Sequence, residues 1–327
     1  MRHDGSGTGA DPADRTGAVV AAGMRERDDV ETEPANLAGR ETRPAVTART
    51  VTAAGRFVAP GRFLAEWVDD LRGCPRLAWR MFVRGFHQQY RHSILGAALA
   101  FAPVTLTALV IAFGRRAQLI SDEIGGVHSA FFAAFGMLVA QALVEGIGEM
   151  QRLFPGNAAF LKRQNVPIES PIVAGLLDLV FRDLVRVVVI AVLMVIFSVR
   201  PSPWIPLAVW GIFGVSLAGG AIGLFMAPFA SLKSDLQALN RVLMLLVITT
   251  TPVFLVPSPE SALGRLMAAN PLTWMFDGVR AAAYGAPGSL AIAACLPLVA
   301  LAALLVGWFL CRLARPHLLE RMTGGGG

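Results

Sequence analysis

Charged side chains inside an otherwise apolar stretch are the residues here whose types and spacing could do chemistry. Near the start of Leu176–Ser198, Asp178 lies four residues before Arg182. Asp183 lies three residues before Arg186. On a helix, both spacings place an acid beside an arginine, so that the two neutralise each other. Charges at membrane depth are costly and tend to mark a pathway. The pairs therefore have two interpretations: they secure one end of a helix, or they border a gate.

The residues needed for ATP hydrolysis or metal chemistry are missing. A Walker-type ATPase needs a glycine-rich loop that ends in Lys-Ser or Lys-Thr, and neither Lys162 nor Lys233 follows such a loop. The five histidines lie outside or at the edges of the apolar segments and lack the spacing of metal ligands. The remaining acid expected at membrane depth is Glu145. We expect a non-catalytic chain that binds no metal and no cofactor of its own.

Composition points to a membrane protein with a polar N-terminal tail. Hydrophobic residues make up 54% of the 327, and charged residues only 16%, against about 25% in soluble domains. Residues 1–60 have no long apolar run and nearly balanced charges, which is typical of disorder. They also lack the apolar core of a secretory signal. We therefore predict a disordered tail that stays in the cytosol.

Six later segments are long and apolar enough to cross a membrane as helices. A bilayer core about 30 Å thick needs roughly 20 such residues. The sequence therefore predicts an all-α integral membrane protein with six transmembrane helices. The predicted spans are Ser93–Phe113, Val127–Ile147, Leu176–Ser198, Trp204–Ala230, Leu239–Val256 and Ser289–Arg312.

Lysine and arginine in the loops predict the orientation. With the N-terminus inside, thirteen basic residues lie on the cytosolic side and five outside. This bias places both termini, including the short tail 316–327, in the cytosol of a multi-pass plasma-membrane protein. The net charge of +6 is then arginine that faces anionic lipid and cytosol. We expect no nucleic-acid partner.

Two cytosolic segments look like docking elements. Arg62–Arg91 mixes aromatic and basic residues after Pro75, which favours an amphipathic helix at the inner membrane surface over a solvated linker. Asn157–Asn165 begins with a good helix-capping residue and carries basic residues near its end, which predicts a short protruding helix. The residues expected to act in the first helix are Trp79, Arg80, Phe82, Arg84, Tyr90 and Arg91, and those in the second are Asn157, Phe160, Leu161, Lys162 and Arg163.

The fifth predicted span contains a break. Thr249–Thr251 directly precede Pro252; proline removes a backbone donor, and hydroxyl groups can bond to the freed carbonyls. We expect a kink near the outer end of the span, followed by two short re-entrant helices within Ser261–Ala286. The kink is either a gating hinge or a static packing feature. The pathway residues expected here are Leu246, Thr250, Pro252, Val253 and Phe254.

The fourth span carries small residues at four-residue spacing, Gly214–Ala218 and Gly219–Gly223. Such spacing lets helix backbones approach closely. Packing within the bundle and a seam between two copies of the chain both fit this pattern.

Three features, in order along the chain, resemble the membrane subunit of type-2 ABC exporters, particularly the polysaccharide and teichoic-acid export branch. Tyr90–Pro103 is similar to that branch's entry to the first span, and Phe160–Val180 to its coupling region and third span. Thr249–Pro257 and Ala269–Gly285 are similar to its broken fifth span and outer Asn-Pro segment. The resemblance covers about residues 62–315, within an expected transmembrane domain 61–315.

The resemblance implies a dimer of permease subunits with two separate ATPase chains, which bind ATP and Mg²⁺. It also implies first and fifth spans that line the path, and outward movement of a cell-surface polysaccharide or lipid-linked glycan. The chain departs from the branch at Ala97–Ala100, where the usual tryptophan is absent. Asp183–Arg186 and Asn270–Thr273 also resemble the drug and lipid exporters of the same superfamily. Both cargo classes therefore stay open.

Overall fold

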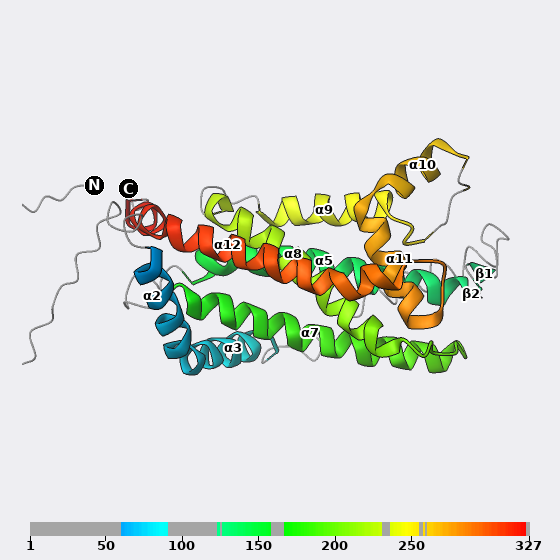
Figure 1. Ribbon diagram of the computed structural model, residues 1–327, viewed down its shortest axis with the longest axis horizontal. Helices are drawn as coiled ribbons and strands as arrows, with labels where there is room; N and C mark the ends of the chain where they lie inside the picture. Colours follow the sequence, from blue (N-terminus) through cyan, green and yellow to red (C-terminus); the bar gives the residue numbers. More distant parts are fainter. Residues whose placement is uncertain are drawn as a thin grey trace, which may run out of the picture. The chain divides into compact units, whose positions relative to one another are not determined.

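The structure, a computed structural model, describes residues 60–90, 123–124, 126–157, 167–230, 236–254, 258 and 260–324. All of them belong to one unit of the chain, Ala53–Gly327. The elements, labelled as in Figure 1, are α2 (Pro60–Gly73), α3 (Pro75–Tyr90), β1 (Glu123–Ile124), β2 (Val127–His128), α5 (Ser129–Gly156), α7 (Glu169–Ile196), α8 (Ile205–Ala230), α9 (Leu236–Thr250), α10 (Ala262–Ala269), α11 (Pro271–Tyr284) and α12 (Leu290–Gly324). The predicted first span, Ser93–Phe113, lies outside the described residues.

Five long helices run alternately between two ends of this unit (Figure 1). We call these the α2 end, where α2 and α3 pack against α7, and the α11 end, where α10 and α11 lie. Helices α5, α8 and α12 run towards the α2 end, and α7 and α9 run away from it. A chain that crosses a membrane several times in succession must alternate the direction of its helices in this way.

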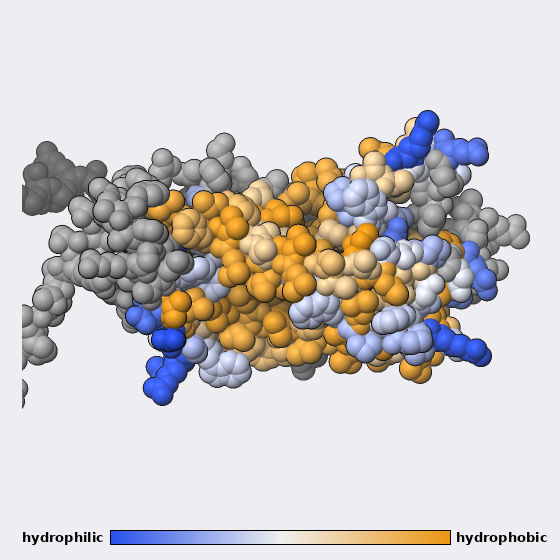
Figure 2. Space-filling model, in the orientation of Figure 1, coloured by the Kyte–Doolittle hydropathy of each residue, from blue (hydrophilic) through white to orange (hydrophobic). Residues whose placement is uncertain are grey.

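Three of the described helices are long and apolar enough to span a membrane, namely α5, α8 and α12. This supports a helical membrane protein and makes three of the six predicted spans candidate membrane crossings by length and composition. Helix α7 is long enough but carries the charged residues near its start, and α9 has only 15 residues, so these two spans stay predictions. Figure 2 shows apolar side chains across the middle of the helices and hydrophilic ones at both ends.

Helix α5 is the most buried of the three candidate spans, and glycines set its distance from α8. A Cβ atom on Gly219 would lie 2.1 Å from the Leu143 carbonyl oxygen, and one on Gly223 would lie 2.3 Å from that of Ile147. A Cβ on Gly146 would lie 2.4 Å from the Ser216 oxygen. Side chains at these positions would therefore force the two backbones apart. The small residues of α8 serve packing within the chain, which supports the first of the two interpretations.

Helix boundaries differ from the hydropathy-based expectations. Val127 pairs with Ile124 in an antiparallel hairpin, so α5 begins at Ser129, and the chain is not strictly all-α. Helix α5 continues to Gly156, α7 begins as early as Glu169, and α12 continues to Gly324. Hydropathy marks only the apolar part of a helix, whereas backbone hydrogen bonding continues into the polar flanks.

The segment after α9 forms two short helices with clear caps. Ser261 Oγ accepts a hydrogen bond from Gly264 N at 2.9 Å and begins α10. Asn270 begins α11, which ends at Gly285 with a φ of 78°, a conformation that glycine adopts without steric cost. Two helices were predicted here. Their re-entrant position in the membrane stays a prediction.

Candidate coupling and gating site

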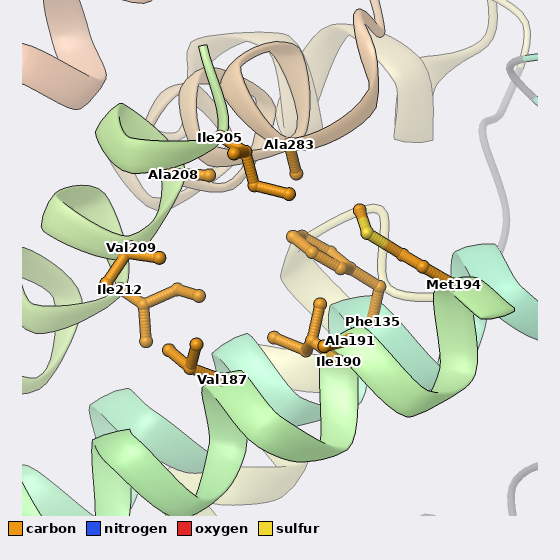
Figure 3. A pocket seen from close by; sticks show the side chains of 10 residues that line it. All are labelled: Phe135, Val187, Ile190, Ala191, Met194, Ile205, Ala208, Val209, Ile212 and Ala283. Carbon is orange, nitrogen blue, oxygen red and sulfur yellow. The ribbon is translucent and has the colours of Figure 1, made fainter. Parts of the chain in front are cut away.

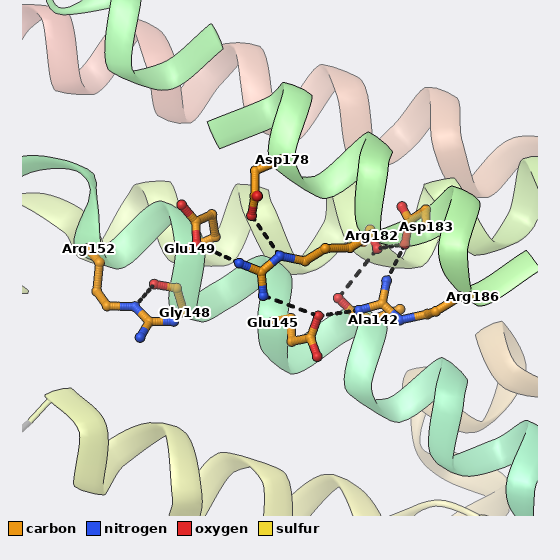
Figure 4. A network of polar contacts seen from close by, with 10 residues as sticks. Ala142, Glu145, Gly148, Glu149, Arg152, Asp178, Arg182, Asp183 and Arg186 are labelled. Carbon is orange, nitrogen blue, oxygen red and sulfur yellow. Dashed lines mark hydrogen bonds and ion pairs between the residues drawn. The ribbon is translucent and has the colours of Figure 1, made fainter. Parts of the chain in front are cut away.

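Arg182 of α7 lies among three carboxylates (Figure 4). Its Nε donates to Asp178 Oδ2 at 2.6 Å. Its Nη1 and Nη2 each lie 3.6 Å from a carboxylate oxygen of α5, on Glu145 and Glu149 respectively. The two glutamates are four residues apart, so Arg182 ties α7 to two successive turns of α5.

Arg186, one turn further along α7, is more deeply buried. Its guanidinium contacts Asp183 and also Glu145 of α5. Ser216 of α8 donates its hydroxyl to Asp183 Oδ1 at 2.7 Å. Asp183 and Arg186 are both buried. The network therefore joins α5, α7 and α8 near the middle of the bundle.

Loss of one partner from a buried ion pair leaves a charge without compensation, at a cost of about 3–5 kcal/mol. Both arginines share Glu145, so the network behaves as one unit that holds α5 and α7 together. We call it the α5–α7 joint: Glu145, Glu149, Asp178, Arg182, Asp183, Arg186 and Ser216. Among the residues that the structure describes, no group of His, Cys, Asp and Glu is placed to hold a metal ion.

The sequence predicted part of this joint. The pairs Asp178–Arg182 and Asp183–Arg186 are confirmed. The bonds across to α5 and α8 were missed, because spacing along one helix says nothing about the neighbouring helix. The Glu145–Glu149 spacing was the available signal: two acids on one face of an apolar helix require cations opposite them. The role of the network in a gate stays a prediction.

At the α11 end, α9 stops at a cluster of hydroxyl groups. Thr249, Thr250 and Thr251 each donate to the carbonyl four residues earlier, at 2.9, 2.7 and 2.5 Å. Pro252 follows in a turn and has no N–H to offer. The predicted interruption is confirmed. The three hydroxyl groups bond to the carbonyls of Leu245, Leu246 and Val247. The carbonyl that Pro252 leaves without its helix donor is that of Ile248, so the role of the threonines as replacement partners stays a prediction.

Asn270 fixes the position of this turn. Its Nδ2 donates to the Thr250 carbonyl at 3.0 Å, and its Oδ1 accepts from Leu272 N at 3.0 Å. One side chain thus links the end of α9 to the start of α11. The Asn-Pro dipeptide indicates a helix start, but the bond to Thr250 could not be read from the sequence.

The predicted pathway residues in α9 and the turn after it differ in exposure within one chain. Leu246 is 50% exposed, whereas Val253 is fully buried. Pro252 is buried and Thr250 is half-buried. Phe254 is partly buried and packs against the first turns of α5. The apolar gate expected from Leu246, Val253 and Phe254 in a dimer stays a prediction.

Helix α3 is amphipathic, as predicted. Phe82 and Phe86 pack on Phe181 of α7, with ring centroids 6.4 and 5.1 Å apart. Arg80 and Arg84 are exposed, and Trp79 is largely exposed too. Tyr90 closes the helix, and Arg91 lies outside the described residues. Location at a membrane surface stays a prediction.

The predicted coupling helix falls mostly outside the described residues, which include only Asn157 of its five expected site residues. Asn157 Nδ2 donates to the Leu153 carbonyl at 2.8 Å, so its side chain bonds to the end of α5. Phe160, Leu161, Lys162 and Arg163 lie in the undescribed segment between α5 and α7.

A second buried ion group at the α2 end was not predicted. Arg312 of α12 contacts Glu169 at the start of α7, and its Nη2 lies 2.8 Å from Asp70 Oδ2 of α2. Trp67 and Trp308 stack edge-on beside it, with centroids 5.9 Å apart. Its members lie up to 242 residues apart in the chain, so no local pattern could reveal it.

An apolar pocket lies between α7 and α8 (Figure 3). Its lining comes from those two helices together with Phe135 of α5 and Ala283 of α11. The labelled side chains carry no hydrogen-bonding group. The pocket offers no chemistry for a reaction.

Comparison with known proteins identifies the family. No curated protein matches the chain significantly. The profile described as ABC-2 type transporter matches residues 76–284, a segment that runs from α3 to the end of α11 and covers more than half of the chain. The matched segment contains the α5–α7 joint and the broken end of α9, and the chain belongs to the ABC-2 type transporter family of membrane permeases.

Proposed function

We propose that this chain is the permease subunit of an ATP-driven exporter that moves a cell-surface polysaccharide or a lipid-linked glycan outward across the plasma membrane. The family implies an ABC ATPase partner. In the proposal, two copies of the chain form the path, the α2 end faces the cytosol, and ATP and Mg²⁺ bind to the partner. The chain supplies the route and the moving parts.

The α5–α7 joint carries the proposal. The segment that leaves α5 after Asn157 and enters α7 at Glu169 connects the two helices at the α2 end. Because the joint ties these helices together, a force on that segment displaces them as one body. At its other end α5 contacts α9 and the turn that follows it, where Gly136 lies against Val253. ATP-driven closure of the partner is thereby transmitted to the broken end of α9.

The partner contact tests this route first. Replacing Phe160 and Leu161 by Asp should abolish co-purification of the ATPase, because charges replace the apolar surface of the coupling segment. Arg200→Gln, an exposed change after the far end of α7, should retain co-purification. Membrane abundance is measured in parallel. ATPase binding by the Asp variant at normal abundance would remove this segment as the coupling site.

A substitution of Pro252 tests whether the broken end of α9 moves during export. Pro252→Ala supplies the missing donor, straightens the end of α9 and should slow export several-fold with ATPase binding intact. Pro206→Ala is the matched control, because Pro206 lies in the first turn of α8, where a missing N–H has little effect. Export at the wild-type rate in Pro252→Ala would leave the kink as a packing feature only.

The cargo class rests on the resemblance to glycan exporters. A drug or lipid cargo is the second candidate, favoured by the Asp183–Arg186 pair and by Asn270, which stand in segments that also resemble that branch. Reconstituted vesicles with the ATPase should translocate a lipid-linked glycan when ATP is added. Transport of a fluorescent phospholipid or dye without glycan transport would select the second candidate.

Orientation is tested by labelling from outside. In a background without Cys74, Cys295 and Cys311, single cysteines at Ser121 and Pro287 should react with an impermeant maleimide. Cysteines at Ser234 and Thr323 should react only after permeabilisation. The reverse pattern would invert the proposed topology, and with it the export direction.

A further inference from the structure

At the α11 end, Arg280 is a buried cation whose hydrogen-bond donors are unused. Its side chain is 2% exposed. Within the described part of the chain, none of its three guanidinium nitrogens has a hydrogen-bond partner. Its nearest acid is Asp277, one turn earlier on α11, at 3.6 Å from Nη1. Asp277 is itself 38% exposed, so part of its charge is screened by solvent.

The opposite wall is aromatic rather than acidic. The Arg280 guanidinium carbon lies 3.8 Å from the centroid of the Phe132 ring on α5. A ring face attracts a cation, but it accepts no conventional hydrogen bond. The site therefore compensates the charge only in part and leaves the donors of the guanidinium unused.

Tyr284 adds a second unused polar group. It follows Arg280 by four residues and so lies on the same face of α11. Its ring packs edge-on against Phe131 and Phe135. Its hydroxyl also has no hydrogen-bond partner among the described residues. Two donor side chains thus share one face of α11, and no described residue accepts a hydrogen bond from either.

The turn after α9 covers this site. A Cβ atom placed on Gly136 would lie 2.6 Å from Arg280 Nη2 and 2.9 Å from the Val253 carbonyl oxygen. The glycine therefore leaves the room in which the guanidinium and the turn meet. The part of the turn that reaches the site is Val253, directly after Pro252, where the helix has already ended.

We propose that Arg280, assisted by Tyr284, is a binding site for a phosphate-type anion that enters when the turn at Pro252–Phe254 lifts away from α5. Guanidinium groups bind phosphate through two parallel N–H donors, and those donors are the ones that the buried state leaves unused. The anion adds to the partial compensation that Phe132 and Asp277 give the charge. The site does not depend on the direction of transport or on a glycan cargo.

The test is thermal unfolding of the purified full chain in phosphatidylcholine nanodiscs, followed by tryptophan fluorescence. Saturating inorganic phosphate, compared with chloride at equal ionic strength, should raise the midpoint by about 3–6 °C. A second arm replaces part of the lipid by phosphatidic acid. A shift in the first arm indicates a free anion, and a shift in the second alone indicates a lipid headgroup.

Three variants make the assignment specific. Arg280→Gln should lose the shift, whereas Arg265→Gln, an exposed arginine on α10, should keep it. Asp277→Asn removes the competing carboxylate and should lower the phosphate concentration at half-effect roughly tenfold. This variant changes a half-exposed residue, so it remains informative even when Arg280→Gln does not fold.

Three results would each overturn the proposal. The first is a wild-type chain that shifts in neither arm. The second is an Asp277→Asn variant that responds like the wild type, and the third is an Arg280→Gln variant that keeps the full shift. Each of them would leave Arg280 as a structural cation held by Phe132 and Asp277.

Discussion

Helix α5 meets a buried arginine at two places, and the two contacts are built differently. Arg186 faces the carboxylates of Asp183 and Glu145 directly. Arg280 faces the ring of Phe132 and a more distant acid. A desolvated cation–π contact contributes about 2 kcal/mol, whereas burial of an ion costs several kcal/mol. The first contact satisfies its charge in this conformation, and the second does not. We infer that the first holds α5 in place and that the second is a contact α5 can release.

We expect the largest effect from a substitution that breaks the ion pair between Arg186 and Asp183. Arg186→Gln leaves Asp183 buried without its cation and should lower the free energy of unfolding by about 3–5 kcal/mol. Arg186→Gln combined with Asp183→Asn should recover a large part of that loss, because no unpaired buried charge remains. Thermal unfolding in detergent measures both. Equal stability of the single variant and the wild type would show that the joint does not hold the helices.

Substitution of two glycines of α5 tests the fixed and the releasable contact without changing any charge. In Gly146→Ala, the new methyl group meets the backbone of α8, 2.4 Å from the Ser216 oxygen, and should destabilise by about 1–3 kcal/mol. In Gly136→Ala the nearest atom is the end of the flexible Arg280 side chain, and the next is the Val253 carbonyl oxygen at 2.9 Å, in the turn that we infer to be releasable. We expect the smaller loss there, measured by the same unfolding assay. A larger loss in Gly136→Ala would reverse the assignment of fixed and releasable contacts.

Substitutions of Asn270 test how the turn near Arg280 is held, because the two polar atoms of its side chain bond to different helices. Asn270→Ala should cost about 1–2 kcal/mol through loss of the α11 cap. Asn270→Asp keeps the capping oxygen but loses the donor to Thr250. It should retain most of the stability and raise hydrogen exchange at the end of α9. Unchanged exchange there would show that the bond to Thr250 does not restrain the turn.

The smallest effects come from neighbouring acids on α2. Asp70 pairs with the buried Arg312, whereas Asp69 pairs with Arg72 at the solvent-exposed surface. Asp70→Asn should destabilise by about 1–2 kcal/mol. Asp69→Asn should change unfolding by less than about 0.5 kcal/mol. Similar effects of the two would mean that burial does not decide the strength of these pairs.

The sequence was informative wherever one helix contains the whole signal. Helix spacing predicted the pairs Asp178–Arg182 and Asp183–Arg186, and Pro252 predicted the end of α9. Contacts between helices were not, because Glu149, Ser216 and Arg280 find their surroundings only after packing. Hydropathy located the centres of α5, α8 and α12 but not their ends. There, charged residues continue the same hydrogen-bonded helix beyond the apolar core.

The glycine contact between α5 and α8 has a consequence for synthesis. Ser216 and Ala142 lie 74 residues apart in the chain. At about 5–20 residues per second, α8 is completed roughly 4–15 s after α5. During that interval the surface of α8 that Gly146 contacts has not yet been made. Glu145 also lacks its partner Arg186, which lies 41 residues later in the chain. Helix α5 is therefore synthesised well before the helices that it packs against. The machinery that inserts this chain has to keep α5, with its unpaired acidic side chains, out of contact with lipid until α7 and α8 are made.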